Sequence, residues 1–353
     1  MHRRRIYAIL KEKCGGCMLT KAEYQKYAMA LYDFCDFPAV RYKILFSFLD
    51  TPFDAPKLAE LRKDFLKSNV VEEMEQTQDV SGGWGKLMSK DYSVKAKIPT
   101  SSVGIERCLY LGLTLHDRDI LFLAREYLLS FLDGTSGEPL FEKNERAFPW
   151  RTAVVCNLLE AITPYTKECD LTYAQWLYIV CRAYESGEYS YERERDAQHE
   201  VFFTRENRLI PMQSGLLLKR RKELPAIVED AMLRHLGGDA NEHGHFWDKT
   251  PRVLPTNFVF NKTRRWFATF NYINQFRGSA LYLSNAVEWI LDNADKDGLW
   301  DWESQIKDPW GYFGYFSCGR SNKRTRTVDC TMEILSFLKQ YIENNTSEAS
   351  TNT

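Results

Sequence analysis

An acid, a thiol and a hydroxyl group stand side by side near the end of the chain, in the segment Asp329-Cys330-Thr331. A carboxylic acid can donate a proton to a substrate when burial in an apolar cavity raises its pKa and keeps it neutral. A neighbouring thiol can hydrogen-bond to that acid without adding charge. Asp329 and Cys330 are therefore the candidate catalytic residues. The alternative for Asp329 is structural, because an aspartate at the start of a helix commonly caps it.

Aromatic side chains are dense in the sequence just before this segment. The faces of aromatic rings attract cations and could stabilise a positively charged intermediate, although so many aromatics could equally fill a core. The predicted substrate-binding residues in this stretch are Trp300, Trp302, Trp310, Tyr312, Phe313 and Tyr315.

Arginine side chains could bind an anionic substrate, since guanidinium groups pair well with diphosphates and acidic sugars. Arg151 and Arg324 are the predicted substrate-binding arginines. Both belong to a set of basic residues near predicted helix starts: Arg41, Arg151, Arg264, Arg265, Arg324 and Arg326. If this set faces outward, it only solubilises the surface. Arg324 and Arg326 would also lower the pKa of Asp329 if they lay against it, which disfavours a proton donor.

Helices must position these residues, because apolar side chains recur at helical spacing and convincing alternating strands are missing. Two such faces are Phe276, Ala280, Leu283, Val287 and Ile290, and Leu171, Ala174, Leu177, Cys181 and Tyr184. Capping-box spacing marks two helix starts, at Thr20 with Glu23 and at Thr172 with Gln175. The sequence predicts an all-α protein.

Similar turns recur along the chain, each with a glycine and most with an aromatic residue soon after it. The glycines are Gly83, Gly137, Gly187, Gly244 and Gly298, at intervals of 54, 50, 57 and 54 residues. A period near 50 indicates stacked helical units that share one core. Residues 1–70 supply a further pair, expected around Lys21–Phe34 and Ala39–Leu49.

About six helix pairs are then available, which predicts a closed α/α toroid as one domain over residues 1–343. An open solenoid is the alternative. The inner helices are expected to start near Val40, Ser102, Arg151, Ile210, Phe267 or somewhat later, and Asp329. The charged region 188–208 is expected to be an exposed loop, and the polar residues 344–353 a disordered tail.

Two motifs resemble those of squalene and oxidosqualene cyclases, in the terpene cyclase and prenyltransferase superfamily. The segment from Gln78 to Trp84, Gln-Asp-Val-Ser-Gly-Gly-Trp, resembles the Gln-Trp repeat of these enzymes, and Gly298-Leu299-Trp300 keeps its Gly-x-Trp half. The run Asp-Cys-Thr-Met-Glu that starts at Asp329 resembles their Asp-Cys-Thr-Ala-Glu segment. The resemblance implies an α/α toroid that acts on an isoprenoid, with Asp329 as the proton donor for cyclisation. The Asp-x-Asp-Asp and Asp-Asp-x-x-Asp motifs of other terpene enzymes are absent.

Bulk properties narrow the function further. The formal net charge of −1 disfavours nucleic-acid binding, for which a basic protein is typical. No apolar run approaches the ~20 residues that span a bilayer, so we expect no transmembrane segment, while peripheral membrane contact stays open. The basic N-terminus is not followed by an apolar stretch of signal-peptide length, and the cysteines are scattered. We expect a cytoplasmic protein with a small-molecule substrate.

Three alternatives stay open. A carbohydrate-active toroid would pair Asp329 with Glu303, Asp301 or Asp248 for acid–base work. A non-catalytic toroid would bind a partner or a lipid. No cofactor is predicted, but zinc, through Asp329 and Cys330 with the upstream histidines His243 and His245, or magnesium, is a less favoured possibility.

Overall fold

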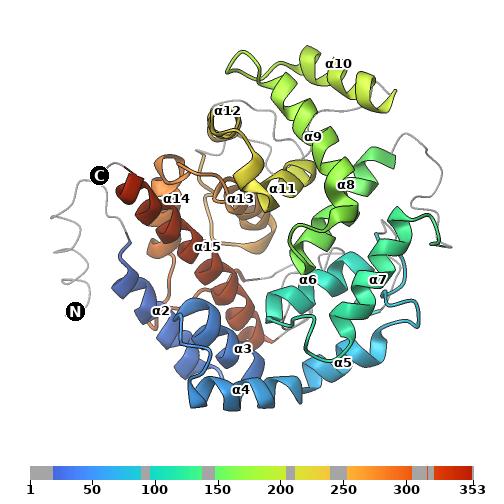
Figure 1. The fold of residues 1–353 in the computed structure, drawn as a ribbon. Coiled ribbons are helices and arrows are strands. Elements are labelled where there is room, and N and C mark those ends of the chain that lie inside the picture. Colours follow the sequence, from blue (N-terminus) through green and yellow to red (C-terminus); the bar gives the residue numbers. More distant parts are fainter. Residues whose placement is uncertain are drawn as a thin grey trace.

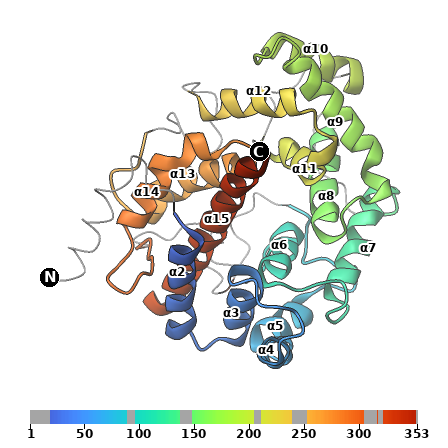
Figure 2. The same ribbon diagram turned by 60° about the vertical axis from the view of Figure 1, so that its left-hand side comes forward.

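Every regular element of the described chain is a helix. The structure is a computed structural model, and it describes residues 19–88, 96–136, 148–203, 211–238, 253–303, 316 and 322–351. The all-α prediction is therefore confirmed for this part of the chain. Figures 1 and 2 show the helices arranged around a common centre, from α2 in blue to α15 in red.

The helices follow one another along the chain, and the longest connections precede α6, α13 and α15. Their bounds are α2 Lys21–Phe34, α3 Pro38–Lys43, η1 Ile44–Phe48, α4 Pro56–Leu66, α5 Asn69–Thr77, α6 Ser101–Leu111, α7 Ile120–Leu132, α8 Phe148–Ile162, η3 Lys167–Cys169, α9 Asp170–Ala183, α10 Tyr191–Phe202, α11 Pro211–Lys219, η4 Arg221–Glu223, α12 Ala226–Gly237, α13 Phe260–Ile273, α14 Ala280–Asp292 and α15 Lys323–Thr351.

Helix α2 starts where the capping-box spacing predicts. The Thr20 hydroxyl accepts a hydrogen bond from the Glu23 N–H at 3.2 Å, and the Glu23 carboxylate accepts one from the Thr20 N–H at 2.9 Å. These two bonds satisfy donors that the first helical turn leaves free. The second capping-box prediction is wrong, because α9 begins at Asp170 and Thr172 lies inside it.

The buried face that the apolar spacing predicted is confirmed for α14 and wrong for α9. Residues Ala280, Leu283, Val287 and Ile290 of α14 are all buried. In α9, by contrast, Leu171 is 71% exposed, and the buried side chains belong to another face: Thr172, Tyr173, Trp176, Ile179, Val180 and Ala183. Two apolar patterns overlap in this helix, and burying the larger aromatic side chains removes more apolar surface from water.

The charged region 188–208 contains a helix, so the loop prediction is wrong for its described part. Ser190 caps α10 by accepting a hydrogen bond from the Arg193 N–H at 3.3 Å. Glu194 is fully buried, and it accepts hydrogen bonds from Tyr189 and Gln198, each at 2.6 Å. These bonds compensate the burial of its charge.

Four of the predicted inner-helix starts, near Val40, Ser102, Arg151 and Ile210, lie within three residues of the starts of α3, α6, α8 and α11. The other two are wrong, because α13 begins at Phe260, seven residues before Phe267, and α15 begins at Lys323, six residues before Asp329. Contacts run from α3 to α6, from α6 to α8 and from α8 to α11, and α15 packs against α2 and η1. The first and last described helices are therefore neighbours. Closure into a toroid stays a prediction, since residues 239–252, which precede α13, lie outside the described part.

The last helix extends beyond the boundary that the sequence predicted. It continues to Thr351, and Asn344, where the disordered tail was expected to start, is buried. The Asn344 amide donates hydrogen bonds to the Asn274 carbonyl at 2.6 Å and to the Ser279 hydroxyl at 3.1 Å. The tail prediction is therefore wrong at Asn344, because a polar side chain there links α15 to the turn between α13 and α14.

None of the helices in the described ranges combines the length and the apolar character needed to cross a membrane.

Candidate functional site

The two tryptophan turns that resemble cyclase repeats make the same hydrogen bond. The indole N–H of Trp84 donates to the Met74 carbonyl at 3.1 Å, and that of Trp300 donates to the Ile290 carbonyl at 2.7 Å. Each acceptor lies ten residues before its tryptophan, in the preceding helix. Both tryptophans are buried, with 2% and 1% of their surface exposed.

A glycine with positive φ lies two residues before the aromatic residue in three turns. Gly82, Gly187 and Gly298 have φ values of 90°, 82° and 80°, and their N–H groups donate to the carbonyl three residues earlier at 2.8, 2.9 and 3.1 Å. This left-handed conformation favours glycine. The repeat is thus real at these turns, but its first member is Gly82 rather than the predicted Gly83. Gly137 and Gly244 lie outside the described residues.

Thr331, within the candidate catalytic segment, holds the second turn in place. Its hydroxyl accepts a hydrogen bond from the Trp300 N–H at 3.0 Å and donates to the Trp300 carbonyl at 3.3 Å. Ser101 plays the same part in the first turn, accepting from the Trp84 N–H at 2.8 Å. The Trp300 ring also packs on Tyr27, with centroids 5.1 Å apart. These contacts assign Trp300 to the packing of the turn rather than to a substrate surface.

Asp329 lies inside α15 and does not cap it. The helix begins at Lys323, and the cap is Asn322, whose side chain accepts a hydrogen bond from the Thr325 N–H at 3.0 Å. The prediction that a helix starts near Asp329 is therefore wrong by about two turns, as is the capping role. Asp329 is 1% exposed, and its carboxylate accepts a hydrogen bond from the Phe316 N–H at 2.9 Å.

The two arginines that precede Asp329 are bound to other acids. Arg324 donates to Asp36 at 3.0 Å, and Arg326 donates twice to Asp301, at 2.6 and 2.8 Å. Neither makes an ion pair with Asp329. Their guanidinium groups are thus engaged by Asp36 and Asp301. The pairing also occupies Asp301, which removes support for Asp301 as one of two free carboxylates in a carbohydrate-active site.

Cys330 is fully buried, and burial raises the pKa of its thiol well above the ordinary value. The thiol therefore stays neutral and adds no charge next to Asp329. Trp302, two residues after the turn, is buried as well. Its ring meets Phe267 edge-on at 5.3 Å, and Phe267 in turn contacts Phe337 of α15 at 5.3 Å. Aromatic faces from α13 and α15 thus lie near the segment.

The structure also describes the two predicted substrate-binding arginines, Arg151 and Arg324. Arg151 is buried near the start of α8, and burial lowers its pKa to about 10. Arg324 is half-exposed. Several predictions fall outside the described residues: Trp310, Tyr312, Phe313, Tyr315, His243, His245 and Asp248.

Sequence reasoning missed two lysines with unusual surroundings. Lys43 is the last residue of α3 and is only 9% exposed, and Lys219 is the last residue of α11. Burial lowers the pKa of both ammonium groups, in Lys43 to about 8. A signal was present, since Lys43 directly precedes the apolar run Ile44 to Phe46 and Lys219 directly follows the apolar run Leu216 to Leu218.

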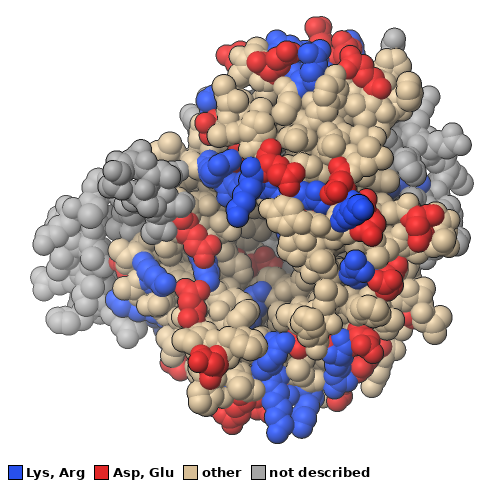
Figure 3. Space-filling view, viewed as in Figure 1, with Lys and Arg blue, Asp and Glu red and all other residues tan. Residues whose placement is uncertain are grey.

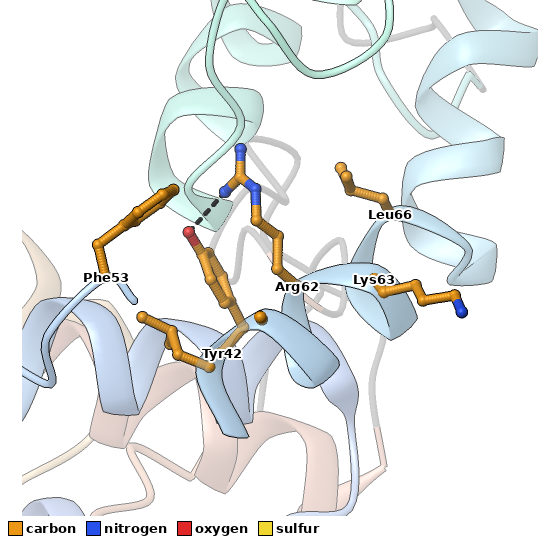
Figure 4. A pocket seen from close by; sticks show the side chains of 7 residues that line it. Tyr42, Phe53, Arg62, Lys63 and Leu66 are labelled. Atoms are coloured by element: carbon orange, nitrogen blue, oxygen red, sulfur yellow. Dashed lines mark hydrogen bonds between the residues drawn. The ribbon is translucent and has the colours of Figure 1, made fainter. Parts of the chain in front are cut away.

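One pocket, of about 330 Å³, opens between α3 and α4. Figure 4 shows Arg62 reaching to the Tyr42 hydroxyl, to which it donates at 2.5 Å, with Phe53 on the opposite side. Arg62 also pairs with the buried Asp117. The guanidinium is therefore engaged by the protein itself. None of the predicted site residues lines this pocket.

No group of three or more histidine, cysteine or acidic side chains is placed to hold a metal in the part of the chain that the structure describes. No protein-family model, no curated protein and no solved structure matches the chain.

Proposed function

We propose that the chain is an isoprenoid-acting enzyme of the terpene cyclase and prenyltransferase type, in which Asp329 starts cyclisation by donating a proton. The observation that carries the proposal is the environment of this carboxyl group. It is buried, and both nearby arginines, Arg324 and Arg326, are paired with other acids. Burial is what favours the neutral, proton-bearing form of a carboxylic acid over the charged form.

In the proposed reaction, the Asp329 carboxyl transfers its proton to a terminal alkene carbon or an epoxide oxygen of the substrate. The π electrons of the next alkene then close a ring, and the resulting cation loses a proton from a neighbouring carbon. The product of an alkene is thus an isomer of the substrate. Rings such as Trp302 and Phe267 are the proposed stabilisers of the cation. No redox cofactor is required for these steps.

A closed toroid and a reducing, cytoplasmic environment belong to the same proposal. The neighbouring first and last helices, α2 and α15, support ring closure. The cysteines of the described part are thiols rather than disulfides, in keeping with a reducing compartment: Cys35, Cys108, Cys156, Cys169, Cys181 and Cys330.

The test is to incubate the purified chain with squalene, oxidosqualene and geranylgeranyl diphosphate and to analyse the products by mass spectrometry. We expect cyclised product from one of the three, and a loss of about 10²- to 10⁴-fold in rate for Asp329→Asn, as for removal of a general acid. The control is Asp64→Asn, which changes an exposed acid of α4 in the same way. Thermal unfolding of each variant establishes that it is folded.

Two outcomes would overturn the proposal. One is a folded wild-type chain that converts none of the three substrates. The other is a folded Asp329→Asn variant that cyclises its substrate as fast as the wild type does, because an amide cannot supply the proton.

A further inference from the structure

Two thiols lie together where α8, η3 and α9 meet. Cys156 belongs to α8, and Cys169 is the last residue of η3, thirteen positions later in the sequence. Both side chains are fully buried. The Cys169 sulfur lies 4.0 Å from the carbonyl oxygen of Cys156, and the two thiols hydrogen-bond to each other. Two cysteine side chains in contact are the starting geometry for a disulfide.

The turn that follows α8 brings Cys169 back to Cys156. Glu160 lies four residues after Cys156, so the two side chains project from the same side of α8. The buried Glu160 carboxylate accepts hydrogen bonds from the N–H groups of Tyr165 and Thr166, at 2.7 and 3.0 Å. These bonds hold the turn against α8, and the turn leads directly into η3 and Cys169.

Arg220 holds both sides of the thiol pair. Its guanidinium group donates to Glu160 at 2.6 Å and to Asp170, the residue after Cys169, at 2.7 Å. Because these bonds tie α8 to the start of α9, the fold itself keeps the two sulfur atoms together. Formation of a disulfide, whose S–S bond is about 2 Å long, then requires a short approach of side chains that already touch.

The hydrogen bond between the thiols makes the two sulfur atoms unequal. It lowers the pKa of Cys156, against the effect of burial, and it raises the pKa of Cys169. The thiolate is the reactive form of a cysteine. Cys156 is therefore the sulfur that reacts first with an oxidant, and Cys169 lies beside it as the resolving thiol.

Burial determines which class of oxidant can reach this pair. Exchange with a disulfide such as oxidised glutathione needs an exposed sulfur, and neither Cys156 nor Cys169 is exposed. Hydrogen peroxide is uncharged and little larger than water. Figure 3 shows the molecule hollowed in its middle, between the regions that hold α15 and α8 in Figure 1, so solvent comes closer to α8 than the outer surface alone would allow.

We propose that Cys156 and Cys169 form a modification site that hydrogen peroxide converts into a disulfide. The Cys156 thiolate attacks one peroxide oxygen, so that an S–O bond forms, the O–O bond breaks and the hydroxide that leaves takes up the proton of Cys156. The Cys169 sulfur then attacks the Cys156 sulfur, so that the S–S bond forms and the S–O bond breaks, and the leaving oxygen takes the Cys169 proton. Two thiols and one peroxide thus give one disulfide and two waters. The site does not depend on the proposed function, since Asp329 has no part in it.

Peptide mapping of the folded full chain tests the proposal. The chain is reduced, freed of reductant, exposed to hydrogen peroxide, then denatured, alkylated and digested with trypsin. We expect the peptides 152–167 and 168–182, which contain Cys156 and Cys169, to be joined, and dithiothreitol to separate them. Peptide 168–182 also contains Cys181, which lies twelve residues further along α9, about 18 Å away. Fragmentation of the joined peptides in the mass spectrometer should therefore place the bond at Cys169.

Variants and stability provide two further measurements. Cys156→Ala and Cys169→Ala should each abolish the joined peptide, whereas the control, Cys181→Ser, should form it as the wild type does. Peroxide should also raise the urea midpoint of the wild type, and dithiothreitol should return it to the starting value, because a disulfide restricts the unfolded chain. Peroxide should not raise the midpoint of the two alanine variants.

Two results would overturn the proposal. One is a folded wild type whose two peptides stay separate at a peroxide concentration that oxidises the partly exposed Cys181. The other is a joined peptide in which fragmentation places the bond at Cys181 instead of Cys169. Both results come from the wild type, so the test stays decisive even if an alanine variant fails to fold.

Discussion

Arg326 binds Asp301 through two hydrogen bonds, of 2.6 and 2.8 Å, between the tryptophan turn and the first part of α15. Both side chains are largely buried, and the carboxylate raises the pKa of the guanidinium. This pair keeps a cation that lies three residues before Asp329 directed at another acid. The Arg326–Asp301 pair therefore packs the tryptophan turn against α15, and it also keeps the Arg326 charge on an acid other than Asp329, the proposed proton donor.

Asp301→Asn should destabilise the protein, because it leaves Arg326 with a neutral partner in a mostly buried position. We expect a loss of about 1–3 kcal/mol in the free energy of unfolding, measured with urea. Asp36→Asn is the matched control: it breaks the exposed pair with Arg324, which is worth at most ~1 kcal/mol. Equal effects of the two substitutions would contradict a structural role for the buried pair.

Because the two tryptophan turns make the same hydrogen bond, the same substitution in each should lower the free energy of unfolding by a similar amount. Trp84→Ala and Trp300→Ala should each cost ~3–5 kcal/mol, as for large core aromatics. Trp84→Phe and Trp300→Phe keep most of the apolar contact and remove only the indole N–H donor, so each should cost less than the alanine variant. Urea unfolding of the four variants measures these values. A variant that unfolds at the wild-type urea concentration would show that its turn does not support the fold.

Substitution of Thr331 tests whether its side chain supports the fold or takes part in the proposed reaction. Thr331→Val removes the hydroxyl that bonds to the Trp300 backbone and should cost about 1–3 kcal/mol, since a buried N–H loses its acceptor. Ser101→Ala should have a similar effect at the other turn. If Thr331→Val instead left stability unchanged and abolished turnover, the hydroxyl would belong to the reaction and not to the repeat.

Local signals in the sequence were sufficient for some of the helices and for three turns of the repeat. The capping box at Thr20 and the apolar stripe of α14 depend on neighbouring residues only, and both are confirmed. Gly298 and Trp300 were recognisable because a turn with positive φ requires a particular residue type. The error in α9 has a tertiary cause. This helix carries two apolar faces, and contacts with the rest of the chain decide that the face with Trp176 is buried and the face with Leu171 is not.

The candidate site was harder to predict, since it depends on charges from distant segments. Nothing local indicates that Arg326 would pair with Asp301, or that Arg324 would reach Asp36 nearly three hundred residues earlier. The lysine at position 43 was visible in an apolar run, but its contact with Tyr110 joins two helices that the sequence does not place side by side. Ion pairs between distant segments depend on how the whole chain folds, so local sequence does not predict them.

The buried ammonium group of Lys43 should give the protein a distinctive pH dependence. The pKa of Lys43 falls from its ordinary value of 10.5 to about 8 in the folded chain, because burial disfavours the charged form. Between these two values the unfolded chain binds more protons, so the contribution of Lys43 to stability rises with pH across this window. Below about pH 8 the penalty is fully present, and the shift corresponds to about 3 kcal/mol.

Lys43→Met removes this penalty while it keeps the apolar stem. The variant should therefore exceed the wild type in free energy of unfolding at pH 7, and the difference should shrink as the pH approaches 10. Comparing the two proteins at each pH cancels the titration of groups that they share, including Tyr110 of α6 and Glu333 of α15, which face the lysine. Lys63→Met, on the exposed side of α4, is the control and should show no such trend. A difference that stays constant with pH would mean that Lys43 is not charged and buried as described.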